Sequence, residues 1–126
     1  MAHSERCSFD LDNLSGLLLT LTALSGEFPA GQLCRLPSTD AYQKKVVKSL
    51  KGNKLLRTYY RDGLRGLRLT ASAKKQLSEQ QPDWFAPLFS GDTATSTPKY
   101  TVLGRLRLHR MAEVLVTMFN ANVLVF

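Results

Sequence analysis

The chain has 126 residues, 44% of them apolar and 9% aromatic, so we expect one domain with a buried core rather than a disordered basic tail. Its formal net charge is +7, and its two cysteines make no disulfide framework, which is typical of a reducing compartment. There is no recognisable signal peptide, and the apolar stretches are too short to span a bilayer, so a cytoplasmic protein without a membrane partner is expected.

The first third of the chain predicts two helices after a disordered tail. Residues 1–9 carry no periodic apolar pattern, which favours disorder. Leucines then recur at helical spacing up to Leu24, which predicts a helix. Ser25-Gly26 is a helix stop signal, so this helix is predicted to end at about Leu24. Pro29 starts a second, short helix over residues 30–36.

A third predicted helix, over residues 40–51, is strongly basic on one side. Ser38 or Thr39 is placed to cap it. Its apolar stripe consists of Tyr42, Val46, Val47 and Leu50. At 100° per residue the opposite face carries Lys44, Lys45 and Lys48, with Lys51 at its edge.

A β-hairpin is predicted next, with strands over residues 55–61 and 64–70. Asp62-Gly63 between them is a strong signal for a two-residue turn. This turn places opposite each other the pairs Leu56–Leu69, Thr58–Leu67 and Arg57–Arg68.

The two faces of this hairpin differ in character. We expect the core face to bury Leu56, Leu67 and Leu69. We expect the other face to expose Arg57, Arg61 and Arg68, beside Tyr59. Because like charges directly opposite each other destabilise a sheet, this arginine-rich face makes sense if an anion binds to it.

The remainder of the chain predicts two more helices and a linker. Thr70 caps a helix that continues to about Gln80, which completes a domain over residues 10–90. Residues 91–99 are rich in Ser, Thr and Pro and are read as a linker. A long helix over residues 100–120 and the start of a strand at residues 123–126 follow.

The last segment, residues 100–126, is more apolar than one helix stripe on a small core requires. Its helix carries Leu103, Leu106, Met111, Val114, Leu115 and Met118. A large exposed apolar surface usually marks an interface, so we expect a homodimer through this segment, or a junction to a further domain beyond Phe126.

Charge is concentrated in the middle of the chain. Twelve of the 17 Lys and Arg residues, and only two of the ten Asp and Glu residues, lie between Arg35 and Lys75. Such a surface suits a polyanion, since neutralised phosphates release counterions. Helix, short helix, basic helix and basic hairpin is the order of a winged helix-turn-helix, so we expect an α+β, mainly α fold with a two-stranded wing and an additional C-terminal helix.

This fold predicts double-stranded DNA as the partner, with the third helix in the major groove and the hairpin along the backbone. Gln43 and Tyr42 are the candidates for base contacts near the start of that helix, although Tyr42 also fits the core. The predicted DNA-binding residues are Gln43, Lys44, Lys45, Lys48, Lys51, Arg57, Arg61, Arg65 and Arg68.

Two segments resemble known winged-helix proteins. The sequence LRGLRLTASAKKQL, residues 64–77, resembles the junction of wing and helix in regulators of the multiple-antibiotic-resistance and phenolic-acid-repressor types. Residues 33–68, including DAYQKKVVKSLKGNKLLRTYYRDGLRGLR, look like the N-terminal domains of plasmid and conjugative-element proteins of the replication-relaxation type. The resemblance covers about half the chain and implies a bacterial transcription or mobile-element regulator.

Catalytic chemistry has little support in the sequence, so we expect neither an enzyme nor a cofactor. The histidines, His3 and His109, have no metal-ligand spacing with either cysteine, and no metal site is predicted. Gly63 and Gly66 fit the hairpin turn rather than a loop that cradles phosphate.

Three functional hypotheses remain open on the sequence. The first is a DNA-binding regulator. The second is a protein-interaction module whose basic surface meets an acidic protein. The third is the N-terminal recruitment domain of a larger mobile-element protein. Salt dependence of binding separates the first two, because phosphate binding must weaken steeply with salt.

Overall fold

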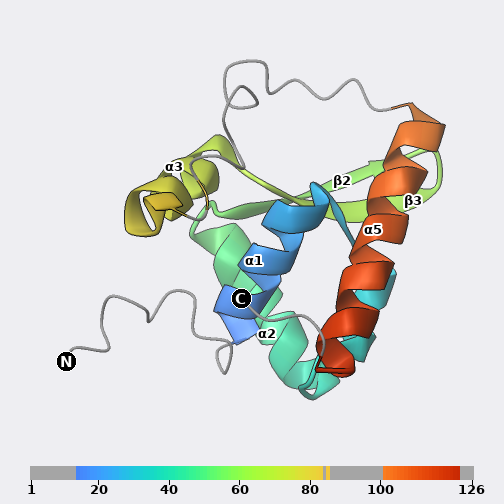
Figure 1. Cartoon of the computed structure of the whole chain (residues 1–126), viewed down its shortest axis with the longest axis horizontal. Coiled ribbons are helices and arrows are strands. Elements are labelled where there is room, and N and C mark those ends of the chain that lie inside the picture. The colour runs from blue at the N-terminus through green and yellow to red at the C-terminus, as the bar shows by residue number, and fades with distance from the viewer. Residues whose placement is uncertain (1–13, 84, 86–100, 123–126) are drawn as a thin grey trace.

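The structure, a computed structural model, describes residues 14–83, 85 and 101–122 and combines helices with one small antiparallel sheet (Figure 1). Its elements in chain order are α1 (Leu14–Ser25), β1 (Phe28–Pro29), the 3₁₀ helix η2 (Ala30–Arg35), α2 (Asp40–Gly52), β2 (Leu56–Arg61), β3 (Leu64–Leu69), α3 (Ala71–Gln80) and α5 (Val102–Asn120). The predicted α+β, mainly helical class is confirmed. The tail at residues 1–9, the linker at 91–99 and the strand start at 123–126 lie outside the described residues.

Three threonines cap the N-termini of α2, α3 and α5. The hydroxyl of Thr39 accepts a hydrogen bond from the backbone of Tyr42, and Thr70 does the same for Ala73. Thr101 caps α5 through the N–H of Gly104. Such caps stabilise a helix by about 1 kcal/mol each, because they satisfy a donor that the first turn leaves unpaired. The predicted caps at residues 38–39 and 70 are therefore confirmed, with Thr39 as the first of them.

The sheet has three strands in the order β1-β3-β2. The predicted register of the hairpin is correct, since Leu56 pairs with Leu69 and Arg57 with Arg68. Both residues of its turn have positive φ, 57° at Asp62 and 77° at Gly63, as a type I′ turn requires. Strand β1, which the sequence did not predict, adds Phe28 and Pro29 to the other side of β3.

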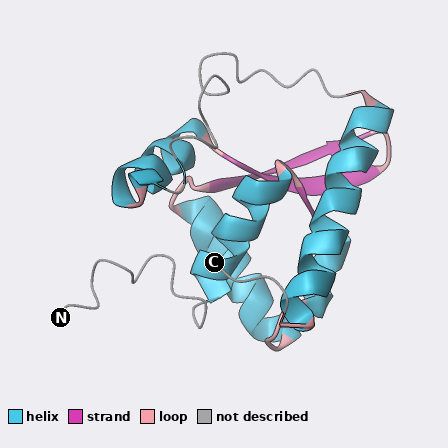
Figure 2. Ribbon diagram, in the orientation of Figure 1, coloured by secondary structure: helices cyan, strands magenta, loops and turns pink. Residues whose placement is uncertain are grey.

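The core lies around α1, which packs against α2 and α5. Figure 2 shows α5 and α3 at opposite ends of the hairpin, with α1 between them. Helix α1 is apolar nearly all round, so it buries leucines on every side. The hydroxyls of Thr22 and Ser25 in this helix donate to the carbonyls of Leu18 and Leu21, which allows both polar side chains to be buried.

The hairpin contributes the three leucines predicted for its core face. Leu56, Leu67 and Leu69 are all buried, and they join Val46 and Leu50 of α2 in the core. Within the described helices, none is long and apolar enough to cross a membrane.

Helix α5 presents an unexpected side to this core. Its buried residues are Arg105, Ala112 and Val116. Most of the apolar side chains that mark it in the sequence point outward: Leu103 is 70% exposed, and Leu106, Met111 and Val114 are exposed as well. A fully buried arginine therefore lies on the inner face of a helix whose outer face mixes apolar side chains with polar and charged ones.

Candidate nucleic-acid interface

Helix α2 presents its lysines to solvent. Lys44, Lys45, Lys48 and Lys51 are all exposed, as the helical spacing predicted. Asp40 is the acid in the first turn and Lys51 the base in the last, an arrangement that favours the helix dipole. The lysines lie opposite a face that packs on the core through Val46 and Leu50.

Gln43, predicted to contact bases, lies in the core instead. It is only 4% exposed, and its Nε2 donates to the carbonyls of Leu36 at 3.1 Å and Ser38 at 3.2 Å. The amide satisfies two carbonyls in the turn between η2 and α2, which is why a polar side chain is stable there. Gln43 therefore fixes the turn between the two helices.

Tyr42 takes the exposed position instead. It is 49% exposed at the start of α2, whereas the apolar stripe predicted from the sequence included it. The core face of the helix runs through Gln43, Val46 and Leu50, one residue away from the predicted stripe at its N-terminal end. A hydrogen-bonded glutamine thus displaces a tyrosine from the interior.

The β2–β3 hairpin exposes basic and aromatic side chains together. Arg57, Arg61 and Arg65 are exposed. Tyr60 is 62% exposed, and the guanidinium carbon of Arg65 lies 4.8 Å from the centre of its ring. Tyr60 and Arg65 face each other across the two strands, so the pair forms one patch near the tip of the hairpin.

Arg68 does not belong to this exposed surface. It is 4% exposed, and its Nε donates to Oε1 of Glu27 at 2.8 Å. The prediction that Arg68 lies with Arg57 and Arg61 on an open face is wrong. The arginine-rich face does hold an anion, as the opposed charges suggested, but the anion is a carboxylate of the same chain.

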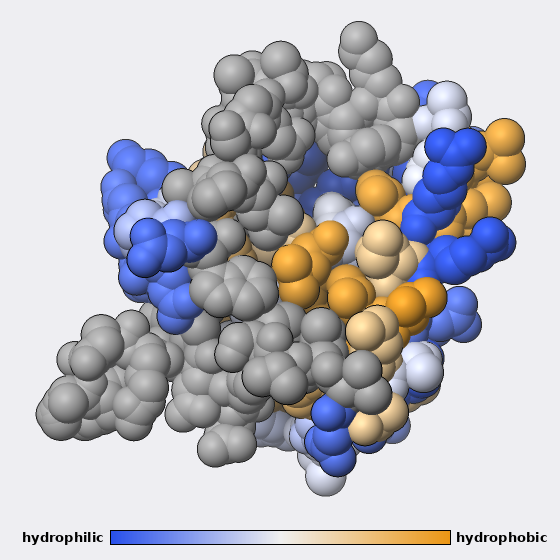
Figure 3. All heavy atoms as spheres, viewed as in Figure 1, coloured by the Kyte–Doolittle hydropathy of each residue, from blue (hydrophilic) through white to orange (hydrophobic). Residues whose placement is uncertain are grey.

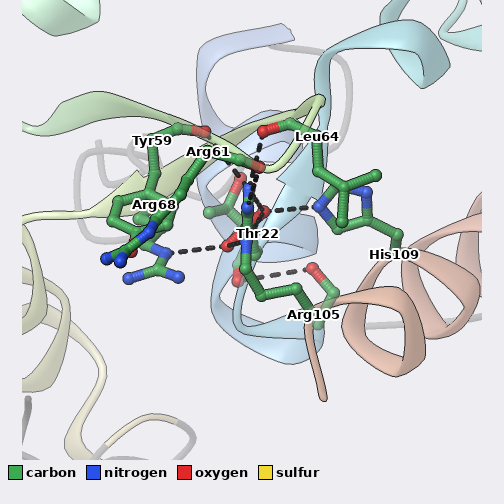
Figure 4. Close-up of polar contacts among 9 residues, drawn as sticks. Thr22, Tyr59, Arg61, Leu64, Arg68, Arg105 and His109 are labelled. Carbon is green, nitrogen blue, oxygen red and sulfur yellow. Dashed lines mark hydrogen bonds and ion pairs between the residues drawn. The ribbon is translucent and has the colours of Figure 1, made fainter. Parts of the chain in front are cut away.

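Glu27 is the centre of a buried ionic cluster, which we define as Glu27, Arg68, Arg105 and His109 (Figure 4). Its carboxylate is fully buried. Nη2 of Arg105 lies 2.7 Å from Oε2, and Nε2 of His109 lies 2.5 Å from the same oxygen. The cluster joins the turn between α1 and β1 to strand β3 and to helix α5.

Arg105 also binds the backbone of the β2–β3 hairpin. Its Nη1 donates to the carbonyl of Arg61 at 2.7 Å, and its Nη2 donates to the carbonyls of Leu64 at 2.9 Å and Tyr59 at 3.3 Å. The ring of Tyr59 lies against two guanidinium groups, 3.7 Å from that of Arg68 and 4.6 Å from that of Arg105. The planar guanidinium thus has its donors divided between one carboxylate and three carbonyls.

Gly66 makes room for the carboxylate. A Cβ atom built on Gly66 would collide with the side chain of Glu27, which lies directly over the strand. The sequence analysis assigned Gly66 to the turn, whereas it lies inside β3 and pairs with Tyr59 and Pro29. A glycine within a strand often marks a close approach of this kind.

Glu27, Arg105 and His109 were not among the residues that the sequence predicted for any site. Two signals bear on them: the glycine within β3, and the spacing of Arg105 and His109, which places both on one helix face four residues apart. Their common partner is 78 residues away from Arg105 along the chain, so no local pattern connects them.

Burial and pairing act on the pKa of Glu27 in opposite directions. Desolvation raises the pKa, and the hydrogen bonds from Arg105, His109 and Arg68 lower it; the net effect is a pKa below the ordinary value. The carboxylate is therefore charged at neutral pH, with cationic donors on both oxygens. Among the described residues, no group of His, Cys, Asp and Glu is arranged to hold a metal ion.

Replacing Glu27 with Gln should strongly destabilise the fold. The neutral amide leaves two arginines buried without a counter-charge, which costs about 3–5 kcal/mol in the free energy of unfolding. Urea denaturation at neutral pH measures this loss. The control is Glu113→Gln, which changes an exposed glutamate on α5 and should change the stability little.

The wild type and Glu27→Gln should also differ in how their stability depends on pH. Because the folded pKa of Glu27 is lowered from 4.5, its stabilising effect is complete above that pH and is lost as the pH falls through the folded value. The free energy of unfolding of the wild type should therefore fall in this acidic range, and that of Glu27→Gln should fall less. An equal acid dependence in both proteins would contradict this role of the carboxylate.

Gly66→Ala should also destabilise the protein, because the new methyl group meets the Glu27 carboxylate on the sheet. Overpacking of this kind costs about 1–3 kcal/mol. Thermal denaturation measures the effect. Gly52→Ala is the matched control, since a Cβ at Gly52 meets no atom within 4 Å, and it should not lower the melting temperature.

Comparison with known proteins adds no relative: no family model, curated protein or solved structure matches the chain. The function is therefore inferred from the geometry and charge of the chain itself.

Proposed function

We propose that this chain binds double-stranded DNA as a winged helix-turn-helix, with α2 in the major groove and the β2–β3 hairpin as the wing. The observation that carries the proposal is the charge between Lys44 and Arg65: eight exposed Lys and Arg side chains and a single acid, Asp62. Exposed positive charge of this density suits the phosphate backbone, because each contact releases condensed counterions.

The order of elements supports this fold. A helix, a short strand, a six-residue 3₁₀ helix and then the basic helix precede the hairpin, and the short strand completes a sheet of order β1-β3-β2. Gln43 fixes the turn between η2 and α2, so the two helices hold a defined angle. At 1.5 Å per residue, the 13 residues of α2 span roughly 20 Å, enough to cross a major groove about 12 Å wide.

The contacting residues follow from exposure. Lysines of α2 and Arg57 of the wing are placed for phosphates. Tyr42 takes the place of Gln43 as the exposed side chain near the N-terminal end of α2, where recognition helices contact base edges. Arg68 and Gln43 have structural roles, so neither belongs to the proposed interface.

A regulator of bacterial transcription or of a mobile element is the role that this activity fits best. Such regulators bind as dimers, and we propose that α5 supplies the dimer contact. Its outer face exposes Leu103, Met111 and Val114. Figure 3 shows apolar surface along α5, interrupted by hydrophilic side chains. A two-fold pair would place two α2 helices about one DNA turn, roughly 34 Å, apart.

Replacing Lys44, Lys45 and Lys48 together with Ala should preserve the fold and weaken binding to duplex DNA. If all three contact phosphates, the slope of log K against log salt becomes shallower by roughly three units. Fluorescence anisotropy with a random duplex at several salt concentrations measures this. The control is Lys74→Ala with Lys75→Ala on α3, which should change the slope less.

An unchanged slope in the triple variant would reject α2 as the DNA-contacting helix. Binding of the wild type to an acidic polypeptide as tightly as to duplex DNA, with the same salt dependence, would favour a protein partner instead.

Sedimentation equilibrium across a concentration series tests the dimer. The wild type should self-associate, and Met111→Glu combined with Val114→Glu should shift it to monomer, because two charges would be buried at the contact. Thr117→Glu, an exposed substitution on the same helix, is the matched control. A wild type that stays monomeric at high concentration would contradict the dimer.

A further inference from the structure

We propose that Arg105 is the positioning residue of the wing: helix α5 holds the tip of the hairpin through Arg105 and thereby sets how much the wing contributes to DNA binding. The inference rests on the proposed function, since it assigns a control point for the same DNA-binding surface. It concerns Arg105 of α5, which binds the backbone of the wing and is not proposed to contact DNA.

The base of the hairpin is held by its neighbours in the chain. The backbone N–H of Leu55 donates to the carbonyl of Leu50 in α2 at 2.9 Å. The hydroxyl of Thr70 donates to the carbonyl of Lys54 at 2.6 Å, and its N–H donates to the carbonyl of Leu55 at 3.2 Å. These bonds connect the start of β2 and the end of β3 to α2 and α3.

The tip of the hairpin is held from α5, through side-chain hydrogen bonds of Arg105. Arg105 donates to the carbonyls of Arg61 and Leu64, the two residues that flank the Asp62-Gly63 turn. It donates as well to the carbonyl of Tyr59, farther along β2. One guanidinium therefore binds the backbone of both strands near the tip. Together with the bonds at its base, the hairpin is held at both the base and the tip.

The orientation of the Arg105 guanidinium is fixed because it is also hydrogen-bonded to Glu27. Its Nε and Nη2 donate to the Glu27 carboxylate at 3.2 Å and 2.7 Å. A planar fork with five donors can satisfy a carboxylate and three carbonyls at once, which a lysine ammonium with three donors cannot. Position and orientation of the tip thus depend on an arginine at this site.

An arginine is an expensive choice for packing alone. Arg105 is fully buried, and an apolar side chain of similar volume would fill the same space without the cost of removing a charge from water. An arginine at this position is explained if the three backbone carbonyls must be held in place. The side chains that this would position are Arg61 and Arg65, which are exposed at the tip beside Tyr60.

The position of the wing therefore also depends on how α5 packs against the core. Arg105 lies in the first turn of the helix, and Ala112 and Val116 farther along are fully buried against the core. Leu103 and Leu106, which flank Arg105 in the chain, are exposed on the outer side. A shift of α5 would therefore move the tip of the wing with it.

The test uses Arg105→Lys in the whole chain, first without DNA. Amide hydrogen exchange should become faster across residues 59–66 and stay unchanged in α1. His109→Gln is the matched control: it changes the same cluster, its amide can still donate to Glu27, and it has no bond to the hairpin, so exchange at the tip should stay close to wild type.

The second measurement is a double-mutant cycle on duplex DNA. Arg61→Ala with Arg65→Ala should shallow the salt slope by roughly two units in the wild type and by much less in Arg105→Lys. The lysine triple variant of α2 should cost the same in both backgrounds. Equal costs of the wing substitutions in both backgrounds, or unchanged exchange at the tip, would overturn the proposal and leave Arg105 as a core residue only.

If Arg105→Lys does not fold, Glu27→Gln combined with Arg105→Met removes one negative and one positive charge together and receives the same two measurements. If neither variant folds, Arg105 serves the fold and the proposal is rejected. A wild type that does not bind duplex DNA rejects the proposed function, whereas hydrogen exchange at the tip still decides whether Arg105 holds the wing.

Discussion

One buried carboxylate connects the parts of this protein that the chain itself keeps far apart. Glu27 receives Arg68 from the sheet and Arg105 and His109 from the last helix. Taking these charges out of water is costly, and the cost is offset because donors converge on both oxygens. Without that carboxylate, the inner face of α5 and the back of the sheet would present two like charges to each other across a dry interface.

The cluster divides the basic residues into two populations with different tasks. Arg68 and Arg105 are internal and bound to Glu27, so their guanidinium groups are not free to contact a partner at the surface. The lysines of α2 and Arg57, Arg61 and Arg65 of the β2–β3 hairpin are exposed to water, and Asp62 is the acid among them. The outward surface is therefore smaller than the composition of the chain implies, but nearly uniform in sign, which suits attraction of a polyanion.

Sequence reasoning succeeded wherever the determining contacts are local. Helix starts at Thr39 and Thr70 and the register imposed by Asp62-Gly63 depend on a few neighbouring residues, and all are as predicted. It failed where a polar side chain finds its partner through the fold. Gln43 is buried because its amide donates to two backbone carbonyls. Arg68 is buried because it pairs with Glu27, which is 41 residues away along the chain. Alternation can identify the face of a strand, but not what covers that face.

The two outer strands of the sheet determine whether copies of this protein can pair edge to edge through their strands. An open strand edge is a template for another chain, and proteins guard it with proline or charge. On one side the edge is β1, two residues long and ending in Pro29, which has no N–H to donate. On the other side it is β2, with Arg57 and Arg61 exposed. The charges proposed to attract DNA thus also repel a second hairpin, and a wing neutralised by substitution would lose protection against edge-to-edge aggregation.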